Sequence, residues 1–370
     1  MFEFCGRIFQ PYIYILTEIL FFCCVILPNA SDNIFRHDAN ESLFFRIFAK
    51  KSKVIHPYIL LYKTLLPKKY RYYMQRAGGD RDMCHETLLH GTFYEEYTVY
   101  DFANKTDGQR RLYLTDALRD KLCRRINSRK GERIIADKYL TYKHFHHYYH
   151  RHIWFIDNNA DYEQIAEAGM CNGRLVAKPP RSCGGNGVHL ITASSIDEWK
   201  EIIKKLKGFV VEEPIVQDDF MSQWNSSSVN TVRMNTILRN GEVKQFAPFL
   251  RTGRIGNFVD NGAKGGLFAS IDAATGVICT DGYDETGTAH TSHPDSGTPY
   301  LGTAIPQWQE LLDLTAAMAQ SMPDMVYIGW DMALTPNGWE PVEANRGEFI
   351  AQQITLHRGL RREFEEICGI

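Results

Sequence analysis

The sequence predicts an α+β domain preceded by a mainly helical region. Beyond Asn172, short β-like runs bounded by Gly, Asn and Pro alternate with two helical patterns, as is typical of an α+β fold. The clearer helical pattern runs from Gln307 to Met322, between Pro306 and Pro323, with an apolar stripe along one face. Between residues 42 and 133, aromatic and basic residues recur at helical spacing.

The length of 370 residues exceeds one typical domain, so we expect more than one folding unit. We divide the chain into an apolar N-terminal extension (1–41), a helical region (42–133) and the main domain (134–370). Residues 12–27 are mostly apolar but contain Glu18, and the run is shorter than the roughly 20 residues that a spanning helix needs. Membrane association through 12–27 is therefore not favoured, and we expect a cytoplasmic protein.

The composition excludes some classes of function. Because 42 Lys and Arg residues are offset by 44 Asp and Glu residues, the chain has no overall electrostatic affinity for nucleic acid. The nine cysteines form no CxxC pair, which argues against a zinc site or a disulfide framework.

The segment Ile134–His152 is predicted to be helical, with Asp137 as its N-cap candidate and Lys138 in the first turn. Its histidines lack metal-binding spacing, so we assign them a surface or packing role.

The first candidate motif is a lysine followed by a glycine-rich turn. Residues 175–178 end in Lys178, and a loop containing Gly184, Gly185 and Gly187 leads to a second β-run over 188–191. Such a hairpin can bring backbone N–H groups and a cation to phosphate oxygens. A purely structural loop is an equally good interpretation of this pattern.

The second candidate motif is a buried strand that ends at a proline. After residues 209–213, Pro214 removes a backbone donor and ends regular pairing. We expect the carbonyl and N–H groups around Glu213 and Ile215 to be free to face a planar heterocycle such as adenine. The alternative is an ordinary strand end.

The third candidate motif is a strand over 228–236 that carries Arg233 on the same face as Thr231 and Asn235. A guanidinium presents several donors in a fixed fork, which suits phosphate. A surface ion pair is the competing interpretation. Further along, polar residues that could line a second substrate subsite are Arg251, Asp260, Asn261 and Lys264.

The fourth candidate motif is the sharpest. Apolar residues alternate along 326–334, so Asp331 projects to the opposite face beside small neighbours. After a turn, Glu343 and Asn345 share a face of the next strand. Two carboxylates and an amide oxygen are hard ligands of the kind that Mg²⁺ prefers, together with nucleotide phosphates and water.

This metal site requires a particular register between the strand that carries Asp331 and the strand that carries Glu343. A four-residue loop with Leu334 opposite Trp339 would place Asp331 opposite Val342 and send Glu343 to the wrong face. We therefore predict an odd loop or a β-bulge that sets Asp331 across from Glu343.

Taken in order, these motifs resemble the ATP-grasp superfamily. Further details resemble its sugar-transfer-associated family, whose members are related to α-L-glutamate ligases, over roughly residues 134–357. The motifs that carry this resemblance are Asp137-Lys138, Glu212 to Gln217, Ser228 to Arg233, Asp260-Asn261 with Gly265-Gly266, His293-Pro294, Ile305-Pro306 and Gly329 to Asp331.

The resemblance implies two α+β subdomains that clamp ATP between their sheets. Phosphates would contact Lys138 and Lys178, and adenine would lie among Glu212, Glu213 and Ile215, with Gln217 near the ribose. Magnesium ions would be held by Asp331, Glu343 and Asn345. A basic residue often follows the second glycine in this family, whereas Asn186 stands here. We therefore assign the cation of the loop to Arg181.

The implied activity is ATP-dependent ligation. A substrate carboxylate would attack the γ-phosphate to form an acyl phosphate, which an amine or similar nucleophile would capture, with Arg233 and Arg251 stabilising the transferring phosphoryl group. We expect small-molecule or glycan-linked substrates, in cell-surface polysaccharide assembly. The alternatives are a kinase on the same scaffold and a nucleotide-binding accessory protein without turnover.

Overall fold

The computed structural model describes residues 59, 62–63, 66–182, 186–256 and 265–370. Leu66–Ile370 forms one compact unit, to which the following description applies. The apolar segment 12–27 lies outside the described residues. Among the described helices, none combines the length and the apolar character needed to cross a bilayer.

Short helices make up the chain before the first strand, which confirms a helical region ahead of the sheets. Their first turns are capped in several places by side-chain oxygens, for example Asp80, Thr115 and Ser128. The helices are α4 (Pro67–Arg76), α5 (Arg81–His90), α6 (Tyr94–Val99), α7 (Asp107–Arg110), α8 (Asp116–Ile126), α9 (Arg129–Ile135) and α10 (Lys138–Phe145), with 3-10 turns at Phe102–Asn104 and His146–Tyr148.

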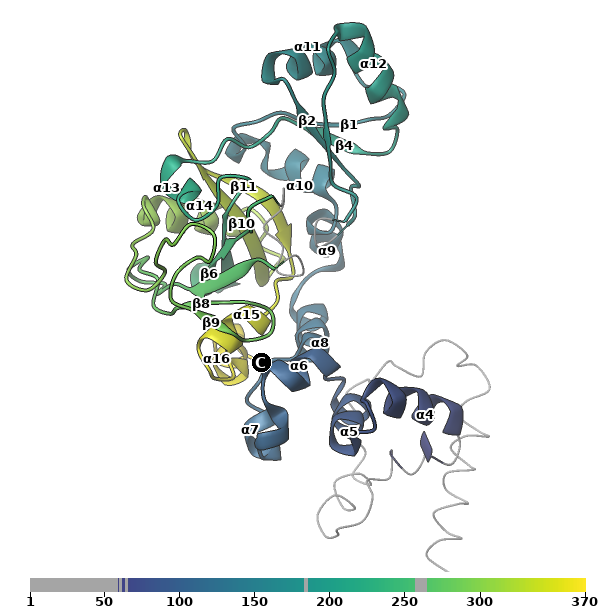
Figure 1. Ribbon diagram of the computed structural model, residues 1–370, viewed down its shortest axis with the longest axis vertical. Helices are drawn as coiled ribbons and strands as arrows, with labels where there is room; N and C mark the ends of the chain where they lie inside the picture. Colours follow the sequence, from purple (N-terminus) through teal and green to yellow (C-terminus); the bar gives the residue numbers. More distant parts are fainter. Residues whose placement is uncertain (1–58, 60–61, 64–65, 183–185, 257–264) are drawn as a thin grey trace, which may run out of the picture. The chain divides into compact units, whose positions relative to one another are not determined.

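A small antiparallel sheet forms the first α+β lobe. Its strands are β1 (Ile153–Phe155), β2 (Leu175–Lys178), β3 (His189–Ile191) and β4 (Val210–Glu212), in the order β1-β4-β2-β3. The pairing of β2 with β3 confirms the predicted hairpin. Helices α11 (Tyr162–Asn172) and α12 (Ile196–Lys205) lie against this sheet (Figure 1). Ile165, Trp199 and Ile203 belong to the hydrophobic cluster that they form with it.

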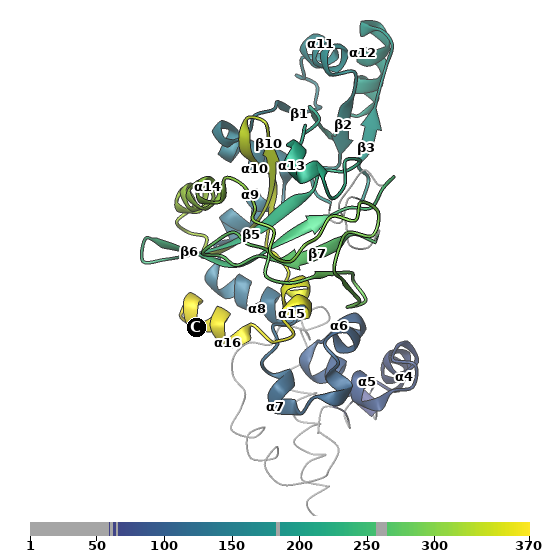
Figure 2. The same cartoon turned by 60° about the vertical axis from the view of Figure 1, so that its left-hand side comes forward.

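A seven-stranded antiparallel sheet forms the second lobe, with the order β11-β10-β5-β6-β7-β8-β9. Figure 2 shows β5, β6 and β7 side by side, away from the lobe of α11 and α12. The strands are β5 (Thr231–Arg239), β6 (Glu242–Thr252), β7 (Leu267–Ser270), β8 (Gly282–Tyr283), β9 (Ala289–His290), β10 (Tyr327–Thr335) and β11 (Gly338–Asn345). The helices of this part are α13 (Asp219–Ser222), α14 (Trp308–Gln320), α15 (Ile350–Thr355) and α16 (Arg361–Cys368).

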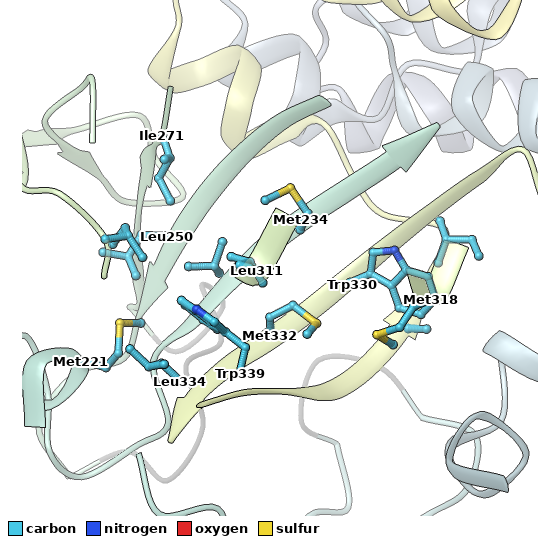
Figure 3. Packing of buried hydrophobic residues seen from close by; sticks show 14 of the residues in the cluster. Met221, Met234, Leu250, Ile271, Leu311, Met318, Trp330, Met332, Leu334 and Trp339 are labelled. Atoms are coloured by element: carbon cyan, nitrogen blue, oxygen red, sulfur yellow. The ribbon is translucent and has the colours of Figure 1, made fainter. Parts of the chain in front are cut away.

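Alternation along the strands gives the large sheet two different faces. Met234, Trp330 and Met332 turn to one face, where they join the core that includes Leu311 and Met318 of α14 (Figure 3). The opposite face packs α15 and α16 over part of its area and is polar over the rest. The predicted apolar stripe of Gln307–Met322 is therefore confirmed as the surface that covers the sheet.

The helix predicted over Ile134–His152 is wrong in its extent. Ile134 and Ile135 end α9, and α10 begins at Lys138 because Asp137 accepts hydrogen bonds from the backbone N–H groups of Tyr139 and Leu140. The predicted N-cap is thus confirmed. The α-helix stops at Phe145 and continues only as a 3-10 turn.

Truncation of Trp330 tests the core that supports the polar face. Its side chain is fully buried, and its indole N–H donates to Thr236 Oγ1 at 2.9 Å. We expect Trp330→Ala to lower the free energy of unfolding by about 3–5 kcal/mol, because it leaves a cavity and removes a buried hydrogen bond to the Thr236 hydroxyl. Urea denaturation followed by circular dichroism measures this. The exposed Leu301 gives the control, and a Leu301→Ala loss as large as that of Trp330→Ala would contradict the assignment.

Candidate functional site

A β-bulge brings the two predicted carboxylates together. Leu334 pairs with Trp339, so the hairpin loop is the even one that would separate them. The register then shifts, because Met332 pairs with Pro341 whereas Asp331 pairs with Glu343. Val342 is the extra residue, and it restores Glu343 to the face of Asp331. The prediction of an odd loop or a β-bulge is confirmed, and the structure contains the β-bulge.

Asp331 is held by two arginines from neighbouring strands. Its carboxylate accepts from Arg233 Nε, from Arg233 Nη2 at 3.0 Å and from Arg251 Nη1 at 3.2 Å. Both Asp331 and Arg233 are almost fully buried. Burial alone would raise the pKa of Asp331, but Arg233 and Arg251 outweigh it and hold this pKa below its ordinary value. Asp331 is therefore an anion on the polar face of the sheet.

Of the two carboxylates, Asp331 and Glu343, Glu343 is the more exposed and has the higher pKa. Its Oε2 lies 3.6 Å from Lys138 Nζ, at the start of α10. Desolvation and then the charge of Asp331 raise the pKa of Glu343, while Lys138, Lys178 and Arg233 act in the opposite direction. The pair therefore concentrates negative charge where a cation can be accommodated.

The end of β11 is fixed by a close backbone approach. A Cβ at Gly329 would lie 2.9 Å from Gly347 Cα and 3.0 Å from Asn345 Oδ1, so only glycine lets this turn lie against the sheet. Asn345 Oδ1 accepts from Gly347 N–H at 2.6 Å, and Arg119 donates to the Gly347 carbonyl at 2.6 Å. Helix α8 thus holds the turn that follows the predicted metal ligands.

A chain of four buried charges joins the two sheets. Lys178 on β2 is paired with Glu212 on β4, and Glu212 lies 3.4 Å from Arg151 Nη2. The other end of that guanidinium binds Glu340 on β11 at 2.7 Å. Burial alone would raise the pKa of Glu212, but Lys178 and Arg151 keep it below its usual value. Arg151 and Glu340 were not identified from the sequence.

The N-terminus of α10 and the glycine-rich loop lie together. Lys138 Nζ donates to the Ser182 carbonyl at 2.7 Å, and its backbone N–H donates to the Pro180 carbonyl at 2.9 Å. Arg181 is largely exposed and bonds to Asp137 at 3.1 Å. Gly187 has a φ of +74°, as a loop glycine can. Gly184 and Gly185 lie outside the described residues, as do Asp260, Asn261 and Lys264.

The strand end after β4 differs in part from the prediction. The N–H of Glu213 is not free, because it donates to the His152 carbonyl at 3.1 Å, and the Glu213 carboxylate accepts from His152 N–H at 2.8 Å. The backbone of Ile215 makes no hydrogen bond to a described residue. Ile215 is therefore the position at which the predicted heterocycle contact stays available.

The side chain of Gln217 is occupied within the protein. Its amide group donates to the carbonyls of Asn225 and Ser228, each at 2.8 Å, and its oxygen accepts from Asn230 N–H at 3.0 Å. These bonds fix the chain just before β5. A direct contact of this amide with a ribose would have to break them, so we now assign Gln217 a positioning task.

Some of the predicted site residues line a cavity of about 630 Å³, whereas Lys178, Ile215 and Asp331 are not among its lining residues. One wall is the large sheet, with Arg233, Arg251 and Glu343, and another contains Lys138 and Arg181. This volume lies within the range of small-molecule sites. Further charged residues on its wall that the sequence patterns did not indicate are Asp116, Arg119, Asp120, Glu132, Arg346 and Glu348.

The donor set is compatible with a magnesium ion. Asp331, Glu343 and Asn345 offer carboxylate and amide oxygens, the ligand types that Mg²⁺ prefers. No group of three or more His, Cys, Asp or Glu side chains suited to a metal occurs among the described residues. The set therefore depends on phosphate and water oxygens to complete an octahedron.

Comparison with protein families gives one informative match. The model of the family described as Sugar-transfer associated ATP-grasp matches residues 117–369, which is more than half of the chain. A comparison with the curated proteins gave no match.

The solved structures to which this chain is similar include three enzymes, all of low identity. They are D-alanyl-alanine synthetase A from Vibrio cholerae (12% identity, 64% of this chain, 65% of that chain, TM-score 0.38), N5-carboxyaminoimidazole synthase from Aspergillus clavatus (12%, 63%, 51%, 0.36) and the ATP-grasp ligase PsnB (11%, 66%, 62%, 0.40). The chain thus spans about half to two-thirds of the length of these proteins. At such similarity nothing follows about its substrates.

Removal of Arg151 tests the buried charge chain. We expect Arg151→Met to lower the free energy of unfolding by about 3–5 kcal/mol, because Glu212 and Glu340 are left as buried neighbouring anions. Urea denaturation gives the value. The control is Arg358→Met, which removes a partner of the exposed Glu363 and should change stability by less than about 1 kcal/mol. Equal effects of the two substitutions would refute a special role for the chain.

Proposed function

We propose that this chain, which belongs to the Sugar-transfer associated ATP-grasp family, is an ATP- and magnesium-dependent ligase that joins a carboxylate to an amine. The observation that carries the proposal is the single polar face on which Arg233, Arg251 and Glu343 line one cavity together with Lys138. Asp331 is buried beneath this surface, where it binds both arginines and pairs with Glu343 across the strands. An anionic ligand with a bound dication would satisfy both signs of charge on this surface. The family description favours a place beside sugar transfer, and the polysaccharide role stays a proposal.

The proposed chemistry has two steps. A substrate carboxylate oxygen attacks the γ-phosphorus of ATP, the bond from that phosphorus to the β-phosphate oxygen breaks, and ADP leaves. The nitrogen of the amine then attacks the acyl carbon, the carbon–oxygen bond to phosphate breaks, and inorganic phosphate leaves as the amine loses a proton. These steps need charge stabilisation and alignment, and no protein nucleophile.

Each charged group has a proposed task in these steps. Lys138 and Lys178 bind phosphate oxygens, and Arg233 and Arg251 neutralise the charge that develops on the transferring phosphoryl group. Asp331, Glu343 and Asn345 would hold magnesium, which when bound neutralises phosphate oxygens. Ile215 contributes backbone groups for the adenine.

Neutralisation of either carboxylate should remove activity. We expect Asp331→Asn and Glu343→Gln each to reduce the rate of ADP formation at least about 100-fold, because either change weakens the site for the dication. ADP and free phosphate are measured with a panel of carboxylate and amine pairs, and the ligated product is identified by mass spectrometry. Chelation with EDTA should abolish activity, and added Mg²⁺ should restore it.

The exposed Glu363 provides the matched control, because among the described residues its ion pair is with Arg358 alone, at the surface of α16. Glu363→Gln should retain the activity of the unaltered protein. Full activity in both Asp331→Asn and Glu343→Gln would contradict the assignment of the site. A ligated product formed without equal amounts of ADP and free phosphate would contradict the acyl-phosphate route.

A further inference from the structure

A second cavity, of about 310 Å³, lies directly beside the first. The two cavities share Asp116, Arg251 and Glu348, so they adjoin at the residues next to the proposed phosphoryl site. A volume of this size lies at the small end of the range for small-molecule pockets. The second cavity is therefore placed to hold the group that meets the activated carboxylate.

The floor and one wall of this second cavity are apolar. Phe249 on β6 and Phe268 on β7 belong to the sheet surface, and Val99 of α6 and Ile354 of α15 line its sides. Phe249 pairs with Arg233, and Phe268 pairs with Arg251. The apolar surface thus continues directly from the two arginines of the proposed reaction site.

The charges of the second cavity are mostly negative. Glu95, Glu285 and Glu348 line it and make no hydrogen bond or ion pair to a described residue. Asp116 also lines it and is paired with Arg119 at 2.7 Å. The cation on its described wall is Arg251, which already binds Asp331. The first cavity differs, since its wall carries Lys138 and several arginines beside its carboxylates.

The crowding of these carboxylates has an electrostatic effect. Burial and then the charge of Glu348 raise the pKa of Glu285. Burial also raises the pKa of Asp116, and Glu348 adds to this increase. A positive charge placed among them would remove their mutual repulsion, whereas an anion would add to it.

We propose that the second cavity is the acceptor subsite of the ligase and that it takes a small amine with an apolar body, bound as the ammonium ion. The apolar part lies over Phe249 and Phe268, where a cation can also be stabilised by the ring faces. The nitrogen lies among Glu285, Glu348 and Asp116. This inference rests on the proposed function, because it names the nucleophile that captures the acyl phosphate.

The separation of charge between the two cavities explains how the reactants are sorted. A carboxylate substrate is attracted by the arginines of the first cavity and repelled by Glu95, Glu285 and Glu348 of the second. The ammonium form has the opposite preference. Arg251 and Glu348 line both cavities, so the two reactants meet at the common boundary. There the ammonium ion first gives one proton to a lining carboxylate, and the neutral nitrogen then attacks the acyl carbon.

The test compares two probes of the same shape. The dissociation constants of 2-phenylethylamine and 2-phenylethanol are measured on the full chain by ligand-observed NMR. We expect the amine to bind at least about tenfold more tightly than the alcohol, because a hydrogen bond to a charged group is worth more than a neutral one. We expect Glu285→Gln and Glu348→Gln each to weaken the amine about tenfold and to leave the alcohol unaffected. Glu167→Gln, on an exposed position of α11, is the matched control.

Equal binding of amine and alcohol, or equal weakening of both by the two substitutions, would overturn the inference. A separate readout addresses the proposed function: hydroxylamine converts an acyl phosphate to a hydroxamate, which is detected with ATP and a panel of carboxylates. Hydroxamate without amine selectivity would leave the ligase proposal standing and defeat the acceptor subsite. Amine selectivity without any hydroxamate would support the cation-binding cavity and defeat the ligase chemistry.

Discussion

The candidate site depends on one extra residue in one strand. Side chains alternate along β10 and β11, and the even hairpin loop would send Asp331 and Glu343 to opposite faces of the sheet. The β-bulge at Val342 adds one residue to β11 and so returns Glu343 to the face of Asp331. The residues nearer the turn keep the pairing that the even loop sets. Trp330 and Met332 can therefore stay in the core while the two carboxylates share the polar face. On the other side of β10, Arg233 of β5 pairs with Asp331 and, with Arg251, holds it as an anion.

The local features of this arrangement could be predicted from the sequence. Alternation assigned Asp331 to the polar face, and the count of residues through the hairpin required a bulge or an odd loop before the two carboxylates could meet. Asp137 was identifiable as an N-cap because its side chain acts only two and three residues away. In the same way, the pattern from Gln307 to Met322 showed which face of that helix would be covered. These are properties of short segments, which a single sequence records directly.

Features that join distant segments could not be predicted. Glu340 lies about 190 residues along the chain from Arg151, and no local pattern links them. Gln217 had the right place in the motif order, but its four hydrogen bonds, to Asn225, Ser228 and Asn230, are decided by how the loop before β5 closes. The approach of Arg119 to Gly347 likewise depends on how α8 packs against the sheet. Sequence position therefore identified candidate residues more reliably than it identified what their side chains contact.

The four charges from Lys178 to Glu340 have a consequence for how this protein can vary between species. The net charge of the four side chains is zero. All four are buried between two sheets that are formed by different parts of the sequence. Loss of any one of these side chains leaves a net charge in the interior, where water cannot screen it. A tolerated substitution must therefore be accompanied by a second substitution among the same four residues. Related sequences should thus keep all four or replace them in oppositely charged pairs. The four positions are therefore expected to vary together rather than independently.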